Sequence, residues 1–159
     1  QTESQHGFTP RLLLERDRRL ETLILTPKKL YLAIKYHPDH ANRPLIEALC
    51  AAFERCGWQS VVVARDLEGW GEKAFNPRDL MRESFRLIDT CAGLVVEISE
   101  KGVGVGIEAG YAHARGLPIL TLLQPQADLP ETLKGISTRV ARYTLADLQG
   151  NVSAWLDHF

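Results

Sequence analysis

Glu108 is the residue of this sequence whose setting most suggests chemistry. It ends the glycine-rich segment Gly102-Val-Gly-Val-Gly-Ile-Glu108, which follows the apolar run 94–98. The run predicts a buried strand, the glycines a turn that a ligand can approach, and residues 108–115 the start of a helix. A carboxylate in the first turn of a helix lies in a partial positive field that favours its ionised form. This predicts a nucleophile or a stabiliser of a cation, and the alternative is a glutamate that only caps the helix.

Glycines of the same segment could hold a phosphate. Gly104, Gly106 and Ala109 satisfy a loose dinucleotide-binding fingerprint. That fingerprint ordinarily follows the first strand, whereas here it follows the third, which disfavours a hydride-transferring enzyme. Phosphate binding by the amides near a helix N-terminus is retained as an expectation.

Polar side chains also follow the first predicted strand. Lys35 and Arg43 could pair with a phosphate, or they could be solvated charges. His37, Asp39 and His40 have the side-chain types that bind zinc or iron. No third histidine or cysteine is placed to join them, so we expect a polar crevice loop with no metal, in which His37 is a candidate substrate contact.

Trp70 lies between Gly69 and Gly71 in the loop after the second predicted strand. An aromatic ring over a crevice can stack on a nucleobase. The alternative is a lid residue folded onto the core. No serine occupies a Gly-x-Ser-x-Gly turn, so serine hydrolase chemistry is not supported.

Strands and helices alternate along the chain, which predicts an α/β fold with a parallel sheet and helices on both faces. We expect residues 1–27 to form a polar tail and a helix (10–25), and residues 28–159 to form a single domain. Ligands of such sheets bind at the carboxyl ends of the strands, where segments 36–43, 65–75 and 99–108 should meet. The expected strands are 30–35, 59–64, 94–99, 119–123 and 139–143, and the other expected helices are 42–56, 76–90, 108–115, 129–135 and 145–159.

The composition is that of an ordinary globular protein. Of 159 residues, 45% are hydrophobic and 25% charged, and the net charge of −1 provides no field for nucleic acid or an anionic membrane. No apolar stretch approaches the roughly 18 residues needed to cross a bilayer, and no secretory signal is visible. Three cysteines without a disulfide framework indicate a reducing compartment, so we expect a cytoplasmic location.

Three segments carry a resemblance to a known family: Cys91-Ala-Gly-Leu-Val-Val-Glu-Ile-Ser99, Gly104-Val-Gly-Ile-Glu-Ala-Gly-Tyr-Ala112 and Gly116-Leu-Pro-Ile-Leu120. They resemble the nucleoside 2-deoxyribosyltransferase family, which includes the 2'-deoxynucleoside 5'-phosphate N-hydrolases. The resemblance covers roughly residues 29–136. It implies a Rossmann-like or flavodoxin-like sheet of five parallel strands, no cofactor, a nucleoside or nucleotide substrate and a homo-oligomer. The family's catalytic glutamate falls on Glu108, and the tyrosine of its first strand falls on Tyr31.

Several positions depart from the family pattern. The aspartate of the helix before the third strand falls on Ser84, which is thereby a candidate substrate contact, and an acidic position at the start of that strand falls on Ala92. The phosphate-contacting serine of the hydrolase branch falls on Gly102, and a small Gly-Ser pair becomes Ile34-Lys35. The loss of the aspartate removes the expected general acid. Glu83 and Asp89 lie in other directions on the predicted helix.

These observations lead to the hypothesis that the protein is a divergent N-glycosidase or deoxyribosyltransferase that acts on a nucleoside or nucleotide. Glu108 would be the nucleophile and Tyr31 would orient it. The glycine amides and Lys35 would hold phosphate or ribose, and Trp70 would cover the base. One alternative is a hydrolase that cleaves NAD, because nicotinamide is a leaving group that needs no protonation. TIR-type NAD hydrolases are similar in this respect, with a flavodoxin-like sheet and a single key glutamate. A non-catalytic nucleotide sensor is the other. The N-terminal helix together with Trp155, Leu156 and Phe159 could form an oligomer interface, and core packing is an equally good explanation of these residues.

Overall fold

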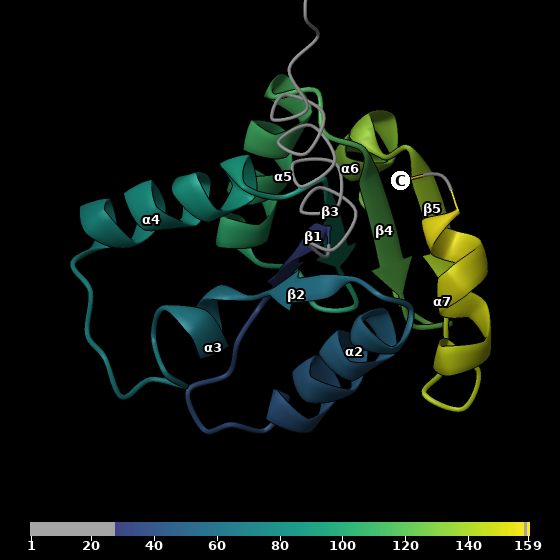
Figure 1. Ribbon diagram of the computed structural model, residues 1–159, viewed down its shortest axis with the longest axis horizontal. Coiled ribbons are helices and arrows are strands. Elements are labelled where there is room, and N and C mark those ends of the chain that lie inside the picture. Colours follow the sequence, from purple (N-terminus) through teal and green to yellow (C-terminus); the bar gives the residue numbers. More distant parts are fainter. Residues whose placement is uncertain (1–27, 158) are drawn as a thin grey trace, which may run out of the picture.

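Five parallel strands form one sheet in the computed structural model, which describes residues 28–157 and 159 (Figure 1). The strand order is β2-β1-β3-β4-β5. This is the flavodoxin-like order, in which the chain reverses its direction across the sheet between β1 and β3. The predicted fold class is confirmed, while the helix expected over 10–25 lies outside the described residues. The strands are β1 (Lys29–Ile34), β2 (Gln59–Val61), β3 (Gly93–Glu97), β4 (Ile119–Leu123) and β5 (Arg139–Arg142).

Helices cover both faces of the sheet (Figure 1). Alternate residues of a strand point to opposite faces. Leu30 and Leu32 of β1 therefore belong to the cluster that includes α2 and α7, whereas Tyr31 and Ala33 pack with α4, α5 and α6. The helices are α2 (Arg43–Arg55), α3 (Val63–Asp66), α4 (Pro77–Asp89), α5 (Val103–Ala114), α6 (Glu131–Ile136) and α7 (Leu148–Leu156).

Local sequence signals account for the ends of the longer helices. The Asn76 side chain accepts a hydrogen bond from the amide of Asp79 at 2.9 Å, and Pro77 occupies the first turn of α4. Gly57 and Gly116, which follow α2 and α5, have φ values of +84° and +74°. Glycine adopts this left-handed conformation without the strain that a side chain brings.

Two predicted elements differ from the structure. The second strand ends at Val61, and residues 63–66 form the short helix α3 in place of the expected strand end. The glycine segment is not an open turn, because α5 begins at Val103 with Gly102 as its N-cap. Each helical glycine costs about 0.5–1 kcal/mol relative to alanine. Burial of Val105, Ala109 and Ala112 against the sheet offsets that cost.

The helical start at Val103 moves Glu108 to the second turn of α5. The remaining predicted elements are confirmed, with ends that differ by at most three residues. Within the described part of the chain, no helix has the length and apolar character that a membrane span requires.

Candidate active site

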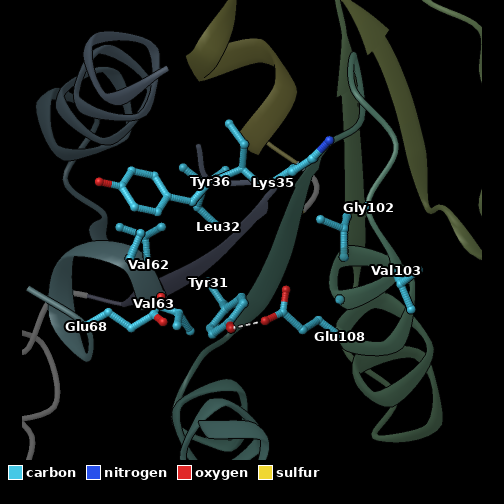
Figure 2. Close-up of a pocket in the computed structure, with 14 residues that line it drawn as sticks. Tyr31, Leu32, Lys35, Tyr36, Val62, Val63, Glu68, Gly102, Val103 and Glu108 are labelled. Carbon is cyan, nitrogen blue, oxygen red and sulfur yellow. Dashed lines mark hydrogen bonds between the residues drawn. The ribbon is translucent and has the colours of Figure 1, made fainter. Parts of the chain in front are cut away.

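A pocket of about 320 Å³ opens at the carboxyl end of β1, where the sheet reverses its winding (Figure 2). This is the position at which flavodoxin-like sheets bind ligands, and the volume lies at the lower end of the range for small-molecule sites. Three parts of the chain form it: the end of β1, the start of α3 with Glu68 after it, and the start of α5. The predicted segment 99–108 contributes as expected, whereas segments 36–43 and 65–75 each contribute one residue, Tyr36 and Glu68. The lining residues are Tyr31, Leu32, Ile34, Lys35, Tyr36, Val62, Val63, Ala64, Glu68, Gly102, Val103, Gly104, Val105 and Glu108.

Tyr31 and Glu108 meet in this pocket. The Tyr31 hydroxyl donates a hydrogen bond of 2.6 Å to Oε1 of Glu108 (Figure 2). Tyr31 is 1% exposed on β1, whereas Glu108 is partly buried on α5. Burial and the nearby Glu108 carboxylate raise the pKa of Tyr31, while a contribution from Ser84 opposes the rise. Tyr31 therefore remains a hydrogen-bond donor throughout the physiological range.

Burial raises the pKa of Glu108 to about 7, and the Tyr31 hydrogen bond opposes that rise. The prediction that a helix N-terminal field keeps Glu108 ionised is wrong. Glu108 lies in the second turn of α5, beyond the first turn within which the helix dipole acts strongly. The carboxyl group is consequently divided between its two protonation states near neutral pH.

Ser84 is not among the residues that line the pocket, and it does not replace the aspartate that the family pattern places there. It is 2% exposed on α4, and its hydroxyl donates to the carbonyl of Leu80 at 2.8 Å. A neutral hydroxyl committed to its own helix is not a general acid. The neighbouring acidic residues are also engaged elsewhere: Glu83 pairs with Arg82 and Arg86, and Asp89 with Tyr111 and Arg115.

Gly102 and Gly104 line the pocket, but Gly106 does not. The Gly106 amide donates to the carbonyl of Gly102 at 3.3 Å within the helix, so it cannot bind a ligand as predicted. Gly106 instead lines a neighbouring apolar pocket with Pro130 and Leu133. The glycine run begins a helix, and only the amides of the first helical turn are free of intrahelical partners.

Lys35 lines the pocket rim, and its ammonium group pairs with Glu100. Nε2 of His37 contacts the other oxygen of the same carboxylate, and both partners lower the pKa of Glu100. His37 is not among the lining residues. The structure therefore places Lys35 at the pocket and His37 behind it, joined through Glu100.

Trp70 lies beside the pocket and does not line it. Its ring packs against Tyr36 at 5.7 Å between centroids, and the Arg43 guanidinium lies 4.4 Å from its centroid. Its φ of +60° is unusual for a bulky residue and aims it at these partners. Tyr36, together with Tyr31, supplies the aromatic side chains of the lining. Tyr36 and Glu68 were missed as single residues, although both fall in segments predicted to meet at the crevice.

Residues 28–157 and 159 contain no group of three or more His, Cys, Asp or Glu side chains that could hold a metal ion. The three cysteines are free, with Cys50 and Cys91 buried.

The fold and the pocket define a flavodoxin-like domain with a carboxylate site at its topological switch point. No protein-family profile matches the chain. A protein of Thermofilum pendens named "Putative 2'-deoxynucleoside 5'-phosphate N-hydrolase 1" is 30% identical over 118 residues, which cover 73% of this chain and 78% of that protein. The chain belongs to the nucleoside 2-deoxyribosyltransferase-like family, as a divergent member.

Solved structures share the fold. The CMP N-glycosidase of Clostridium botulinum superposes with a TM-score of 0.61 at 21% identity, over 81% of this chain and all of that chain. The 2-deoxyribosyltransferase of Bacillus psychrosaccharolyticus superposes with a TM-score of 0.60 at 11% identity, over 76% and 90% of the two chains. These two similarities concern the arrangement of the backbone.

Proposed function

We propose that this protein cleaves the N-glycosidic bond of a nucleoside or nucleotide, with Glu108 as the nucleophile. The observation that carries the proposal is the Tyr31–Glu108 pair in a pocket at the switch point of a family sheet. The relative's printed name, an N-hydrolase of 2'-deoxynucleoside 5'-phosphates, describes the same class of reaction. So do the names of the CMP N-glycosidase and the 2-deoxyribosyltransferase.

In this mechanism, an ionised Glu108 oxygen approaches the anomeric carbon as the bond to the base nitrogen breaks. The bonding electron pair leaves with the base, and the positive character of the sugar is stabilised by the carboxylate. A carbon–oxygen bond to Glu108 then forms. Water completes hydrolysis by displacing Glu108 as a carboxylate and releases a proton to the departed base or to solvent. A second base that attacks in place of water, and loses its own proton in the same way, completes a transfer. The Tyr31 hydroxyl orients Glu108 and stabilises its ionised form.

Phosphate or ribose hydroxyls would occupy the side of the pocket formed by α5. The amides of the first turn of α5 and the Lys35 ammonium provide donors there. Glu100 already neutralises part of the Lys35 charge, so a phosphate would compete with Glu100 for this cation. Lys35, Gly102 and Gly104 are the substrate-binding residues that this arrangement supports.

Leaving groups that depart without protonation suit the site better than others. Ser84 occupies the family's aspartate position, and its hydroxyl is engaged with Leu80. Nicotinamide leaves NAD as a neutral molecule and needs no proton. NAD is therefore the first alternative substrate for the same Glu108 chemistry.

A nucleotide sensor is the second candidate function. The combined replacement of family positions at Ser84, Ala92 and Gly102 favours it. In a sensor, Glu108 would accept hydrogen bonds from ribose hydroxyls and no bond would break.

The decisive experiment measures base release by chromatography from deoxynucleosides, their 5'-monophosphates, ribonucleotides and NAD. We expect Glu108→Gln to lower release by at least about 10³-fold, because the nucleophile is lost. The variant should still be stabilised thermally by the same compound. Glu131→Gln, on the exposed face of α6, is the matched control. Binding without release from any compound would favour the sensor.

We also propose that the protein forms a homo-oligomer through the outer face of α5. Val103 and Ile107, one turn apart, are 83% and 47% exposed beside the apolar pocket lined by Pro130 and Leu133. Of the two explanations given for Trp155 and Leu156, core packing holds, because both side chains are buried in the core, each 5% exposed. Light scattering of the wild type and Val103→Asp tests the proposal, which a monomeric wild type would contradict.

A further inference from the structure

Glu68 brings a second carboxylate into the pocket that holds Glu108. It follows α3, is partly buried and lines the cavity. Among the described residues, its carboxylate has no hydrogen-bond or salt-bridge partner, in contrast to the paired Glu83, Glu97 and Glu100. Figure 2 shows its side chain extending from the α3 side of the pocket toward Tyr31.

The backbone around Glu68 is held firmly. Its amide donates to the carbonyl of Val63 at 3.0 Å, and its own carbonyl accepts from the amides of Gly71 and Lys73 at 3.0 and 2.9 Å. The two glycines of the following turn have φ values of +54° and +91°, which only glycine adopts readily. These hydrogen bonds fix the backbone from which the Glu68 side chain enters the pocket, while its carboxylate has no partner among the described residues and is free to bind a ligand.

The pocket has two chemically different walls. The wall on the α5 side, which carries Glu108, is lined by Gly102 and Gly104 and also by Val103 and Val105. Its polar groups, the amides of the first turn of α5 and the ammonium group of Lys35 on the lining, suit a sugar and its phosphate. Val62, Val63 and Ala64 form an apolar wall, which suits the flat face of a base, and Glu68 ends this wall. If the anomeric carbon lies at Glu108, the base extends over the apolar wall and its polar edge faces Glu68.

We propose that Glu68 selects nucleobases that present an exocyclic amino group, namely cytosine or adenine over uracil or hypoxanthine. The inference rests on the proposed function, which fixes the anomeric carbon at Glu108. An ionised carboxylate only accepts hydrogen bonds, and a glutamate that accepts from the N4 amino group of cytosine is a known pairing. A keto oxygen in the same place would direct its lone pairs at the carboxylate and leave both groups unsatisfied.

The test uses two substrate pairs that differ only in amino against keto: cytidine with uridine, and adenosine with inosine. Each is supplied in the sugar and phosphate form that the wild type uses best, and kcat/KM is measured for base release. We expect the wild type to prefer the amino member at least about tenfold, since a site built for a donor rejects the analogue that lacks it. Glu68→Gln should remove most of this preference, because a carboxamide both accepts and donates.

Glu72→Gln is the control, since Glu72 is exposed in the same loop and does not line the pocket. An unchanged amino-to-keto ratio in Glu68→Gln, in a folded variant, would overturn the inference while leaving the proposed function intact. A change in the ribose-to-deoxyribose ratio instead would place Glu68 against the sugar and also overturn it.

If the wild type releases no base, the proposed cleavage fails, and the same pairs are then compared by calorimetric binding. A tenfold preference for the amino members that is lost in Glu68→Gln would still support base selection by Glu68. Equal affinities of the wild type for both members would overturn it.

Discussion

The protonation of one side chain controls the proposed chemistry. Glu108 must be ionised to attack a sugar, yet burial raises its pKa to about 7. The Tyr31 hydroxyl is the described contact that opposes this rise. Activity should therefore increase with pH on passing through about 7, as the fraction of ionised Glu108 grows.

Tyr31→Phe should move this acidic limb to higher pH. The variant loses the donor that stabilises the ionised carboxylate, so the pKa of Glu108 rises further. Base release should fall at every pH and fall most below pH 7. The pH profile of kcat/KM measures the shift.

Tyr143→Phe is the matched control for Tyr31→Phe. Tyr143 is also a buried tyrosine that donates to a glutamate, but its partner is Glu97 on the other face of the sheet. Removal of the Tyr143 hydroxyl should leave the acidic limb of the pH profile at the same pH. A limb that stays fixed or moves to lower pH in Tyr31→Phe would contradict the role given to this hydroxyl.

Among the elements, the start of α5 determines what the pocket can hold. Gly102 is the N-cap of this helix and has no side chain to accept from the helical amides. A β-carbon at this position would meet the Lys35 and Val105 side chains at 3.4 and 3.5 Å, which is ordinary contact. The backbone is extended, with φ of −143°, so other residues fit there without strain.

Gly102→Ser should therefore be tolerated and should favour phosphorylated substrates. The family's hydrolase branch carries a phosphate-contacting serine at this position. One hydrogen bond to a charged group contributes about 1.5–3 kcal/mol, so the ratio of kcat/KM for a 5'-monophosphate over its nucleoside should rise roughly tenfold or more. Gly110→Ser, farther along α5 in open space, should leave the ratio unchanged. An unchanged ratio in Gly102→Ser would contradict a phosphate site at this helix start.

Most elements could be predicted because their apolar patterns and end signals agree. The short continuous apolar runs around Leu94 and Ile119, bounded by turn residues, predict strands buried on both faces of a sheet, and Asn76-Pro77 is a helix-start signal. The start of α5 could not be predicted in this way. Its glycines disfavour a helix locally, and only the packing of Val105 and Ala109 against the sheet overrides them.

The candidate site was predictable to the extent that topology determines it. Tyr31 and Glu108 are 77 residues apart and meet because β1 lies next to β3, whose following helix is α5. Side-chain directions in the loop after α3 were not predictable. The left-handed backbone of Trp70 turns its ring to Tyr36 and Arg43, while Glu68 faces the pocket. No sequence period specifies such turns.

On the scale of the whole molecule, the end of the chain is packed onto the start of β3. The Phe159 ring lies over Gly93 and meets Trp58 edge to face at 6.1 Å between centroids. A β-carbon at Gly93 would lie 2.1 Å from the Phe159 ring. Gly93→Ala should therefore displace the ring and lower the free energy of unfolding by about 1–3 kcal/mol, the usual cost of overpacking.

Urea denaturation of a double-mutant cycle measures this contact. In Phe159→Ala, the added methyl group at Gly93 has no ring to displace, so Gly93→Ala should then cost markedly less. Equal losses in both backgrounds would show that the alanine acts through the nearby Pro118 carbonyl, 3.3 Å from the same position, and not through Phe159.

The active-site carboxylate should lower the stability of the folded protein at neutral and alkaline pH. The pKa of Glu108 is about 7 in the folded state and about 4.3 in an unfolded chain. Between these values the folded state binds more protons, so the free energy of unfolding decreases as the pH rises from about 4 to 7. Glu108→Gln removes this penalty and should stabilise the protein at pH 8 by about 1–3 kcal/mol, with little effect near pH 4.5. Urea denaturation at both pH values, with Glu131→Gln as the control, tests this sign. A Glu108→Gln protein no more stable than the wild type at pH 8 would show that the carboxylate is solvated in the folded state, and that burial does not hold it near its neutral form.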